Sequence, residues 1–107
     1  MRVIYLIRGG SRVGKCALDI NDNVAFLYGV RVYKKYRGMG YCKCLVQKAI
    51  SWVRSLRTRQ SRITTIRLHV EHRNISAIKC YQHNGFVVVR KNYDNRKLFG
   101  YTMERAI

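Results

Sequence analysis

The sequence predicts an α/β protein built on one mixed β-sheet, with the element order β-β-β-α-β-α-β-β. Three apolar stretches near the start are separated by glycine- and asparagine-rich turns, which is typical of strands that follow one another in a sheet. A long amphipathic segment then begins at a glycine turn, and strand and helix patterns alternate after it. Such alternation packs helices against a sheet and gives mixed strand directions.

Length and composition favour a single globular domain. The 107 residues leave little room for a second core, so we expect one domain over residues 1–107. An apolar content of 48% and a charged content of 25% belong to the globular class. There is no proline-rich linker, repeat or low-complexity tract to mark a boundary.

The first part of the chain reads as three strands. Residues 3–7 and 13–20 are apolar runs joined through Gly9 and Gly10, a hairpin signal. A turn at residues 21–23 leads to a long strand at residues 24–33, rich in β-branched and aromatic side chains. Gly29 interrupts this strand, which predicts a bulge or the close approach of another group.

The middle of the chain reads as a helix followed by a strand. From the glycine turn at residues 37–40 to about Arg57, apolar residues recur at helical spacing at Cys42, Leu45, Val46, Ala49, Val53 and Leu56. A basic loop is expected at residues 58–62 and a strand at 63–70, where Ile66, Leu68 and Val70 alternate with Arg67 and His69.

The last part predicts one short helix and two strands. Asn74 is a favourable residue before a helix and Gly85 a favourable residue after one, so they bracket a helix over residues 75–84. Residues 86–90 are an apolar strand, and residues 98–104 form the final strand after a turn at 92–95.

Cysteine usage and hydropathy point to the cytoplasm. Cys16, Cys42, Cys44 and Cys80 show no framework spacing, so we expect free thiols in a reducing compartment and no disulfides. No apolar run approaches the roughly 18–20 residues of a membrane span. A set of Cys80, His69, His72 and His83 matches no common zinc spacing, and we predict no metal.

The charge balance is strongly basic, with 22 lysines and arginines against 5 acidic residues and a net charge of +17. Between Asp22 and Glu71 there is no acidic residue. This excess predicts attraction to a polyanion such as RNA, DNA or an acidic protein surface. A generally basic surface without a specific partner is the alternative.

The glycine turn before the first helix has the features of a phosphate site. Helix N-termini offer unpaired N–H groups and a partial positive charge, and Gly38 and Gly40 let the backbone come close. Arg37 and Lys43 add charge-assisted contacts. The dinucleotide-binding and phosphate-loop motifs are both absent, and a plain structural turn is the alternative.

Two blocks together carry a family resemblance. Residues 32–42, which include Tyr36, Arg37, Gly38 and Gly40, resemble the acetyl-CoA-binding motif of the GNAT N-acetyltransferase superfamily. Residues 68–86, with Leu68, His69 and Val70 followed by Asn74, Ala77, Tyr81, Gly85 and Phe86, resemble that family's second motif. The blocks occur in the family's order and at its usual separation, which implies a GNAT-like sheet and acetyl-CoA as co-substrate.

The resemblance implies a role for each matching position. Val30 and Val32 would offer backbone groups to the pantetheine arm, and Asn74 would contact that arm or cap the second helix. Tyr81 would lie near the cofactor sulfur and protonate the leaving thiolate, because a phenol releases its proton only near pH 10; an amphipathic core tyrosine is the alternative. The pyrophosphate would be held by Arg37, Gly38, Met39, Gly40, Tyr41, Cys42 and Lys43.

The residue that takes the amine proton is less defined by the resemblance. Many members place a glutamate on the central strand, but residues 25–28 contain none. His69 is the best substitute, since an imidazole ionises near neutral pH and some protein N-terminal acetyltransferases of the family have a similar Leu-His-Val segment. A histidine hydrogen-bonded within the sheet is the alternative. Glu71, Tyr28 and Tyr33 are weaker candidates.

Departures from the family pattern bear on the acceptor and on assembly. Cys42 and Lys34 stand where the family usually has a smaller residue and a proline. The resemblance covers residues 3–104 here but only the C-terminal two-thirds of a typical member, whose first strand and first two helices have no counterpart. An exposed sheet edge and an uncovered apolar face favour a homodimer.

The sequence therefore predicts transfer of an acetyl group from acetyl-CoA to a primary amine on a protein or RNA-linked substrate. The expected docking surface is basic and consists of Lys48, Arg54, Arg57, Arg59 and Arg62. One alternative is a catalytically inactive GNAT-fold module that binds CoA, nucleic acid or both. A nucleic-acid-binding protein with no cofactor is the third hypothesis, and no common nucleic-acid motif supports it.

Overall fold

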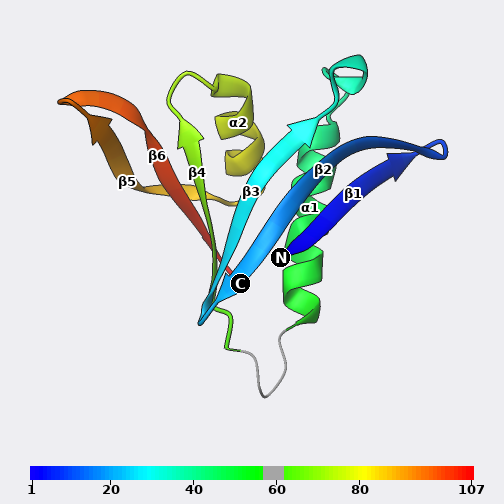
Figure 1. The fold of residues 1–107 in the computed structure, drawn as a ribbon, viewed down its shortest axis with the longest axis horizontal. Helices are drawn as coiled ribbons and strands as arrows, with labels where there is room; N and C mark the ends of the chain where they lie inside the picture. Colours follow the sequence, from blue (N-terminus) through cyan, green and yellow to red (C-terminus); the bar gives the residue numbers. More distant parts are fainter. Residues whose placement is uncertain (57–61) are drawn as a thin grey trace.

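The computed structural model describes residues 1–56 and 62–107 as a six-stranded sheet and two α-helices (Figure 1). The sheet has the strand order β1-β2-β3-β4-β6-β5. The predicted element order is confirmed. The elements are β1 (Arg2–Arg8), β2 (Ser11–Asn21), β3 (Val24–Val32), a 3-10 turn η1 (Lys34–Tyr36), α1 (Tyr41–Ser55), β4 (Thr65–Glu71), α2 (Ile75–His83), β5 (Val87–Asp94) and β6 (Lys97–Ala106).

The first three strands form an antiparallel meander, as the turn residues predicted. Gly9 and Gly10 adopt positive φ angles of 58° and 79° in the first turn, and Asp22 has a φ of 57° in the second. Glycine and aspartate tolerate this left-handed region better than β-branched residues do, so the turns fall where the sequence placed them.

A β-bulge in β3 confirms the expectation for Gly29. Lys15 pairs with Arg31 and Ala17 pairs with Tyr28, so two steps along β2 correspond to three along β3. Gly29 has a φ of 60°, a conformation that allows the extra residue. The bulge changes the direction of the end of β3, from Val30 to Val32.

Strands β3 and β4 are parallel neighbours for a short distance only. Pairing links Val24 with Thr65, Ala25 with Ile66 and Phe26 with Arg67, and it stops there. Beyond this point the two strands diverge, as Figure 1 shows. Because backbone groups beyond the last pair have no partner on the facing strand, this divergence leaves ladder positions free for an extended ligand.

Both helices pack on one face of the sheet and build the core there. Helix α1 contacts β1, β2, β3 and α2. The predicted apolar stripe is confirmed, since Leu45, Val46, Ala49 and Val53 are buried and Ile50 joins them. No helix in the described ranges is long and apolar enough to cross a membrane.

The C-terminal hairpin is longer than predicted. The turn lies at Asn95 and Arg96, both with positive φ, and the β5–β6 ladder continues up to the Asp94–Lys97 pair. The sequence placed the turn at residues 92–95 because polar residues that favour turns gather there. β5 is an exposed edge strand, so composition alone ended it too early. The basic loop predicted at residues 58–62 lies largely outside the described residues, and only Arg62 is described, as exposed.

Buried Cys16 makes alkaline stability a testable property of this core. Burial raises the pKa of the Cys16 thiol from 9.0 to about 11, and nearby Lys48 opposes the shift. The unfolded chain ionises at the lower pKa, so stability is present below it and is lost as the pH rises from 9.0 to about 11. Denaturant titrations should show a loss of roughly 2–3 kcal/mol across this range. Cys16→Ala should make this dependence less steep and leave the part due to Tyr81, whose phenol pKa is raised from 10.0 to about 12. Cys44→Ala should not change it, and an unchanged slope in Cys16→Ala would contradict the assignment.

Candidate functional site

A cleft of about 440 Å³ opens where β3 ends and the two helices begin. The end of β3, the η1 turn, and the N-termini of α1 and α2 all contribute to it. Its lining residues are Val30, Arg31, Val32, Tyr36, Arg37, Gly38, Gly40, Tyr41, Cys42, Asn74, Ser76 and Ala77. Most residues predicted for the cofactor site therefore meet in one cleft.

The N-terminus of α1 faces this cleft without a capping side chain. Gly40 is the N-cap residue, with a φ of 78°, and no acidic residue lies in the first turn. Gly38 also has a positive φ, of 80°, and open space lies over both glycines. The first N–H groups of the helix thus lack side-chain acceptors, and with the helix dipole they favour an anion.

Arg37 is fixed beside these N–H groups. Its Nε donates a hydrogen bond of 3.0 Å to the carbonyl oxygen of Val32. This contact anchors the guanidinium at the end of β3 and leaves its terminal nitrogens without a partner among the described residues. A planar guanidinium held in this way suits a phosphate oxygen.

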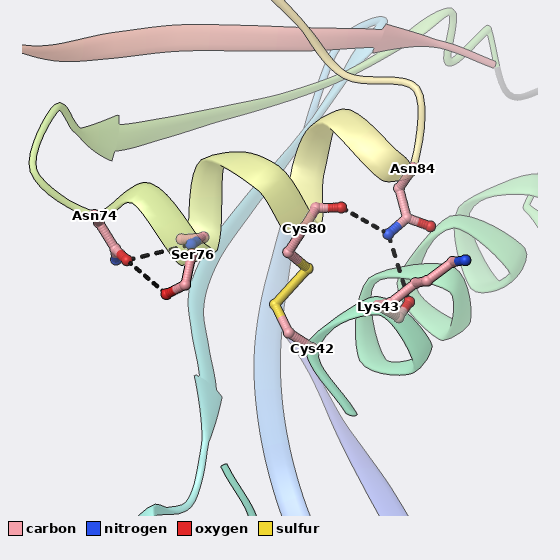
Figure 2. The surroundings of a disulfide bond; sticks show 7 residues. Cys42, Lys43, Asn74, Ser76, Cys80 and Asn84 are labelled. Carbon is pink, nitrogen blue, oxygen red and sulfur yellow. Dashed lines mark hydrogen bonds between the residues drawn. A yellow bond between two sulfur atoms is a disulfide. The ribbon is translucent and has the colours of Figure 1, made fainter. Parts of the chain in front are cut away.

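The start of α2 forms the opposite wall, and it confirms Asn74 as an N-cap. The Asn74 side chain accepts a hydrogen bond of 3.3 Å from the backbone N–H of Ala77. Ser76 Oγ donates to the same oxygen at 3.5 Å, as drawn in Figure 2. At the other end, Gly85 has a φ of 82° and follows the helix as predicted.

The cysteine prediction was wrong for two of the four residues. Cys42 and Cys80 form a disulfide between the first turn of α1 and α2, while Cys16 and Cys44 are free. Their separation of 38 residues gave no signal, but helix packing brings their Cα atoms to 6.3 Å, within bridging range. Figure 2 shows Asn84 beside this link, donating to the carbonyl oxygens of Cys80 and Lys43 at 3.0 and 3.5 Å.

Tyr81 belongs to the hydrophobic core and is not one of the residues that line the cleft. It directly follows Cys80, whose disulfide partner Cys42 lines the cleft. Its side chain is only 6% exposed and meets Phe86 edge to face, with ring centroids 6.0 Å apart. Burial, together with the nearby Cys16, raises the pKa of Tyr81 to about 12. The phenol is thus protonated at neutral pH. Among the described residues no fully buried polar side-chain atom lacks a partner, and the unpartnered Tyr81 hydroxyl therefore keeps contact with solvent.

His69 lies on β4 just past the last β3–β4 pair, on the sheet face away from the helices. Its ring is exposed, and Nδ1 lies 3.0 Å from Thr102 Oγ1 on β6. His69 does not line the cleft, and neither do Met39 and Lys43. Met39 is 62% exposed on the turn before α1.

The other proton-acceptor candidates are placed differently. Tyr28 donates to Asp19 at 3.1 Å, and burial and this carboxylate raise the pKa of the phenol. A phenol held protonated is a poor base. Glu71 borders a separate hollow near the β5–β6 turn. In the described part of the chain no group of three or more His, Cys, Asp and Glu side chains is arranged to hold a metal.

Sequence reasoning missed four lining residues, namely Arg31, Tyr36, Ser76 and Ala77. Tyr36 and Ala77 belong to the two recognised blocks, so the signal for them was present. Ser76 could have been found from its place beside the Asn74 cap, since short polar side chains gather in first turns. Arg31 lines the cleft after the bulge in β3, and no local sequence pattern shows which side chains of the strand face the cleft beyond that bulge.

Comparisons with known proteins show the family and the fold of this chain. The model of the acetyltransferase (GNAT) family matches residues 2–86. By sequence, no curated protein matches the chain. The structure of the ribosomal-protein-S18-alanine N-acetyltransferase from Escherichia coli has a TM-score of 0.79 and 22% identity, covering 99% of this chain and 68% of that one.

Two further structures share the fold. Ard1 from Thermoplasma volcanium has a TM-score of 0.74 and 26% identity, covering 92% of this chain and 66% of that one. A NatC complex bound to Gag peptide and CoA has a TM-score of 0.72 and 22% identity, covering 90% of this chain and 62% of that one. The chain spans about two-thirds of the length of these structures. With 85 residues (2–86) matched by the family model, the chain belongs to the acetyltransferase (GNAT) family, whose members generally use acetyl-CoA.

Proposed function

We propose that this protein is an N-acetyltransferase that transfers an acetyl group from acetyl-CoA to a primary amine on a protein or RNA-linked substrate. One observation carries the proposal: the uncapped N-terminus of α1 opens into a cleft that also contains Arg37 and the end of β3. Such a site suits a pyrophosphate attached to an extended arm.

The residues of the cleft fit the parts of the cofactor. The N–H groups of the glycine turn and of the first turn of α1, from Gly38 to Lys43, would bind the pyrophosphate, with Arg37 adding charge. Val30 and Val32 would pair with the amides of the pantetheine arm, because β3 has no strand partner on that side beyond Phe26. Asn74 borders the same space. When bound, the cofactor supplies an activated acetyl group as a thioester.

Tyr81 is the proposed acid. Its chain neighbour Cys80 is bonded to Cys42, which lines the cleft, and from there a protonated phenol would donate to the departing sulfur. Its pKa of about 12 keeps it protonated until then. The oxyanion that forms during transfer needs a fixed donor, and a backbone N–H near the bulge at Gly29 is suited to that role. In this proposal the protein therefore acts by positioning two hydrogen-bond donors, the Tyr81 hydroxyl for the sulfur and a backbone N–H for the oxyanion.

The charge of the surface supports a large acidic acceptor. Among the described residues, Arg67 is the one lysine or arginine whose side chain pairs with a carboxylate, that of Glu104. Most of the described basic side chains therefore have no carboxylate partner, and the net charge of +17 would attract RNA or an acidic protein. Of the predicted docking residues, Lys48 donates to the Tyr5 carbonyl at 2.6 Å, and Arg57 and Arg59 lie outside the described residues.

The test is calorimetric titration of acetyl-CoA and CoA at low and moderate salt, with thiol release measured in the same samples. Peptides and charged tRNA would serve as acceptors. Binding with thiol release establishes the transferase, and steep loss of release with salt identifies a polyanionic acceptor. No binding at either salt concentration would overturn the proposal.

A second candidate is a catalytically inactive module that binds CoA, nucleic acid or both. Two observations favour it: residues 25–28 of the central strand carry no carboxylate, and Tyr81 does not line the cleft. Acetyl-CoA binding without thiol release from any acceptor would support this module over the enzyme.

Arg37→Ala is expected to weaken acetyl-CoA binding about 10–100-fold, because a hydrogen bond to a charged group contributes roughly 1.5–3 kcal/mol. Calorimetry measures the change directly. Arg54→Ala removes the same charge at the far end of α1 and is the matched control. Equal affinities for the Arg37 and Arg54 variants would show that only net charge matters.

Two further parts of the proposal concern assembly and location. A second copy could cover the exposed β5 edge, where Val87, Val89 and Tyr93 are 61%, 50% and 62% exposed, and form a homodimer. A monomeric mass in solution would exclude this. A cytoplasmic location would keep Cys42 and Cys80 reduced, so the location proposed from free thiols now depends on the redox state of this pair.

A further inference from the structure

Four polar side chains form a continuous chain across three strands on the sheet face away from the helices. Arg90 Nε lies 3.0 Å from Asn92 Oδ1 on β5. Asn92 Nδ2 lies 3.1 Å from Thr102 Oγ1 on β6. Thr102 Oγ1 lies 3.0 Å from His69 Nδ1 on β4. Thr102 pairs directly with Arg90 and His69 in the ladders, so sheet register places the members side by side.

The direction of these hydrogen bonds is fixed at the Arg90 end. A guanidinium only donates, so Asn92 must present its carbonyl oxygen to Arg90. The amide nitrogen of Asn92 then faces Thr102 and can only donate to it. Arg90 Nη2 approaches the same Thr102 oxygen at 3.5 Å, also as a donor. Thr102 Oγ1 therefore accepts from β5.

Because Thr102 Oγ1 accepts from β5, its own proton is available for a hydrogen bond to His69. A threonine hydroxyl has one proton, and Thr102 is buried at 3% exposure, which keeps water from accepting that proton. Among the described residues, His69 Nδ1 is the one acceptor within hydrogen-bond distance. Thr102 must donate to Nδ1, so Nδ1 carries no proton and neutral His69 carries its proton on Nε2.

We propose that the chain of Arg90, Asn92 and Thr102 fixes His69 as the Nε2–H tautomer, so that His69 donates a hydrogen bond to a carbonyl or carboxylate oxygen of the amine substrate. The substrate part rests on the proposed function. Asn92 and Thr102 are positioning residues that act through His69. The Nε2 atom has no partner among the described residues, and the exposed ring lies where β3 and β4 begin to diverge.

This role replaces the proton acceptor predicted from the sequence. In the Nε2–H form the lone pair of the imidazole is on Nδ1, where the Thr102 proton already occupies it. The exposed nitrogen can orient a substrate oxygen but cannot take a proton from the amine. The amine proton would leave through water.

His72 provides an internal reference with the opposite proton position. Its Nδ1 lies 2.9 Å from the carbonyl oxygen of Phe99, which can only accept. His72 must therefore carry a proton on Nδ1. Two histidines in one protein are thus expected to show opposite tautomers, which excludes an explanation from general solvent conditions.

The test is NMR of protein with ¹⁵N-labelled histidine, at an alkaline pH where the imidazoles are neutral. We expect His69 to be protonated on Nε2 and His72 on Nδ1, with resonances assigned from the His69→Gln and His72→Gln variants. A His69 signal protonated on Nδ1 in the unmodified protein overturns the proposal. This result does not depend on enzymatic turnover.

Asn92→Asp is the most informative variant, because it should reverse the hydrogen bonds from residue 92 to His69 without changing the size of the side chain at position 92. The new carboxylate accepts the Thr102 proton, so Thr102 Oγ1 must accept from His69, and the His69 proton should move to Nδ1. An unmoved proton contradicts the proposal. Thr102→Ser should preserve the original tautomer, and it controls for simple disturbance of the sheet.

Activity then tests the donor role separately. His69→Ala should lower kcat/KM about 10-fold, the value of one hydrogen bond. His69→Gln should recover part of this loss, because its amide nitrogen can donate in place of Nε2. Equal losses of roughly 10²–10⁴-fold in both variants would indicate a base and overturn the donor role. Absence of thiol release with any acceptor would instead refute the proposed function, while the NMR result would still decide the proton position.

Discussion

Tyr81→Phe is expected to lower the rate of thiol release about 10²–10⁴-fold while leaving acetyl-CoA affinity nearly unchanged. The variant removes only the hydroxyl proton proposed to reach the departing sulfur. Tyr81 does not line the cleft that would hold the pyrophosphate, so ground-state binding should persist. Single-turnover thiol release, with calorimetry on the same samples, separates these two quantities.

The structure also predicts that this variant folds. The Tyr81 hydroxyl has no hydrogen-bond partner among the described residues, and its ring packs against Phe86 in a way that phenylalanine can repeat. Tyr93→Phe, on the exposed β5 edge, is the matched control and should keep the full rate. A Tyr81→Phe rate within a few-fold of the unmodified protein would show that the tyrosine is only a core residue.

Breaking the Cys42–Cys80 disulfide is expected to lower the free energy of unfolding by about 4 kcal/mol. The bond closes a segment with a sequence separation of 38, and the loss of chain entropy in the unfolded state scales with the length of the closed loop. Urea denaturation of oxidised and reduced protein measures the difference. Cys80→Ala should reproduce the reduced protein and should itself show no response to reductant.

Cys44 supplies the control for this experiment. It is a free cysteine on the same helix, so Cys44→Ala should keep the response to reductant. Identical denaturation midpoints for oxidised and reduced protein would contradict a stabilising bond. Cys42 lines the cleft and Cys80 precedes Tyr81, so acetyl-CoA binding and thiol release should be compared in both redox states.

The sequence by itself determined the local features of the site. Helical spacing placed the buried stripe of α1, and Asn74 and Gly85 marked the ends of α2, because caps and periodicity depend on residues only a few positions apart. Gly29 predicted the bulge, since few other residues adopt its backbone angles. The family followed from two such local blocks in a fixed order.

Tertiary structure alone decided which distant residues meet. Three features bring together residues whose local sequences do not indicate one another. They are the Cys42–Cys80 bond, the burial of Tyr81 and the contact of His69 with Thr102. Each depends on helix packing or on strand register, which sum many weak contacts across the sheet. A pattern in the chain can show that a histidine lies on a strand, but only its neighbour on the next strand determines where its proton is held.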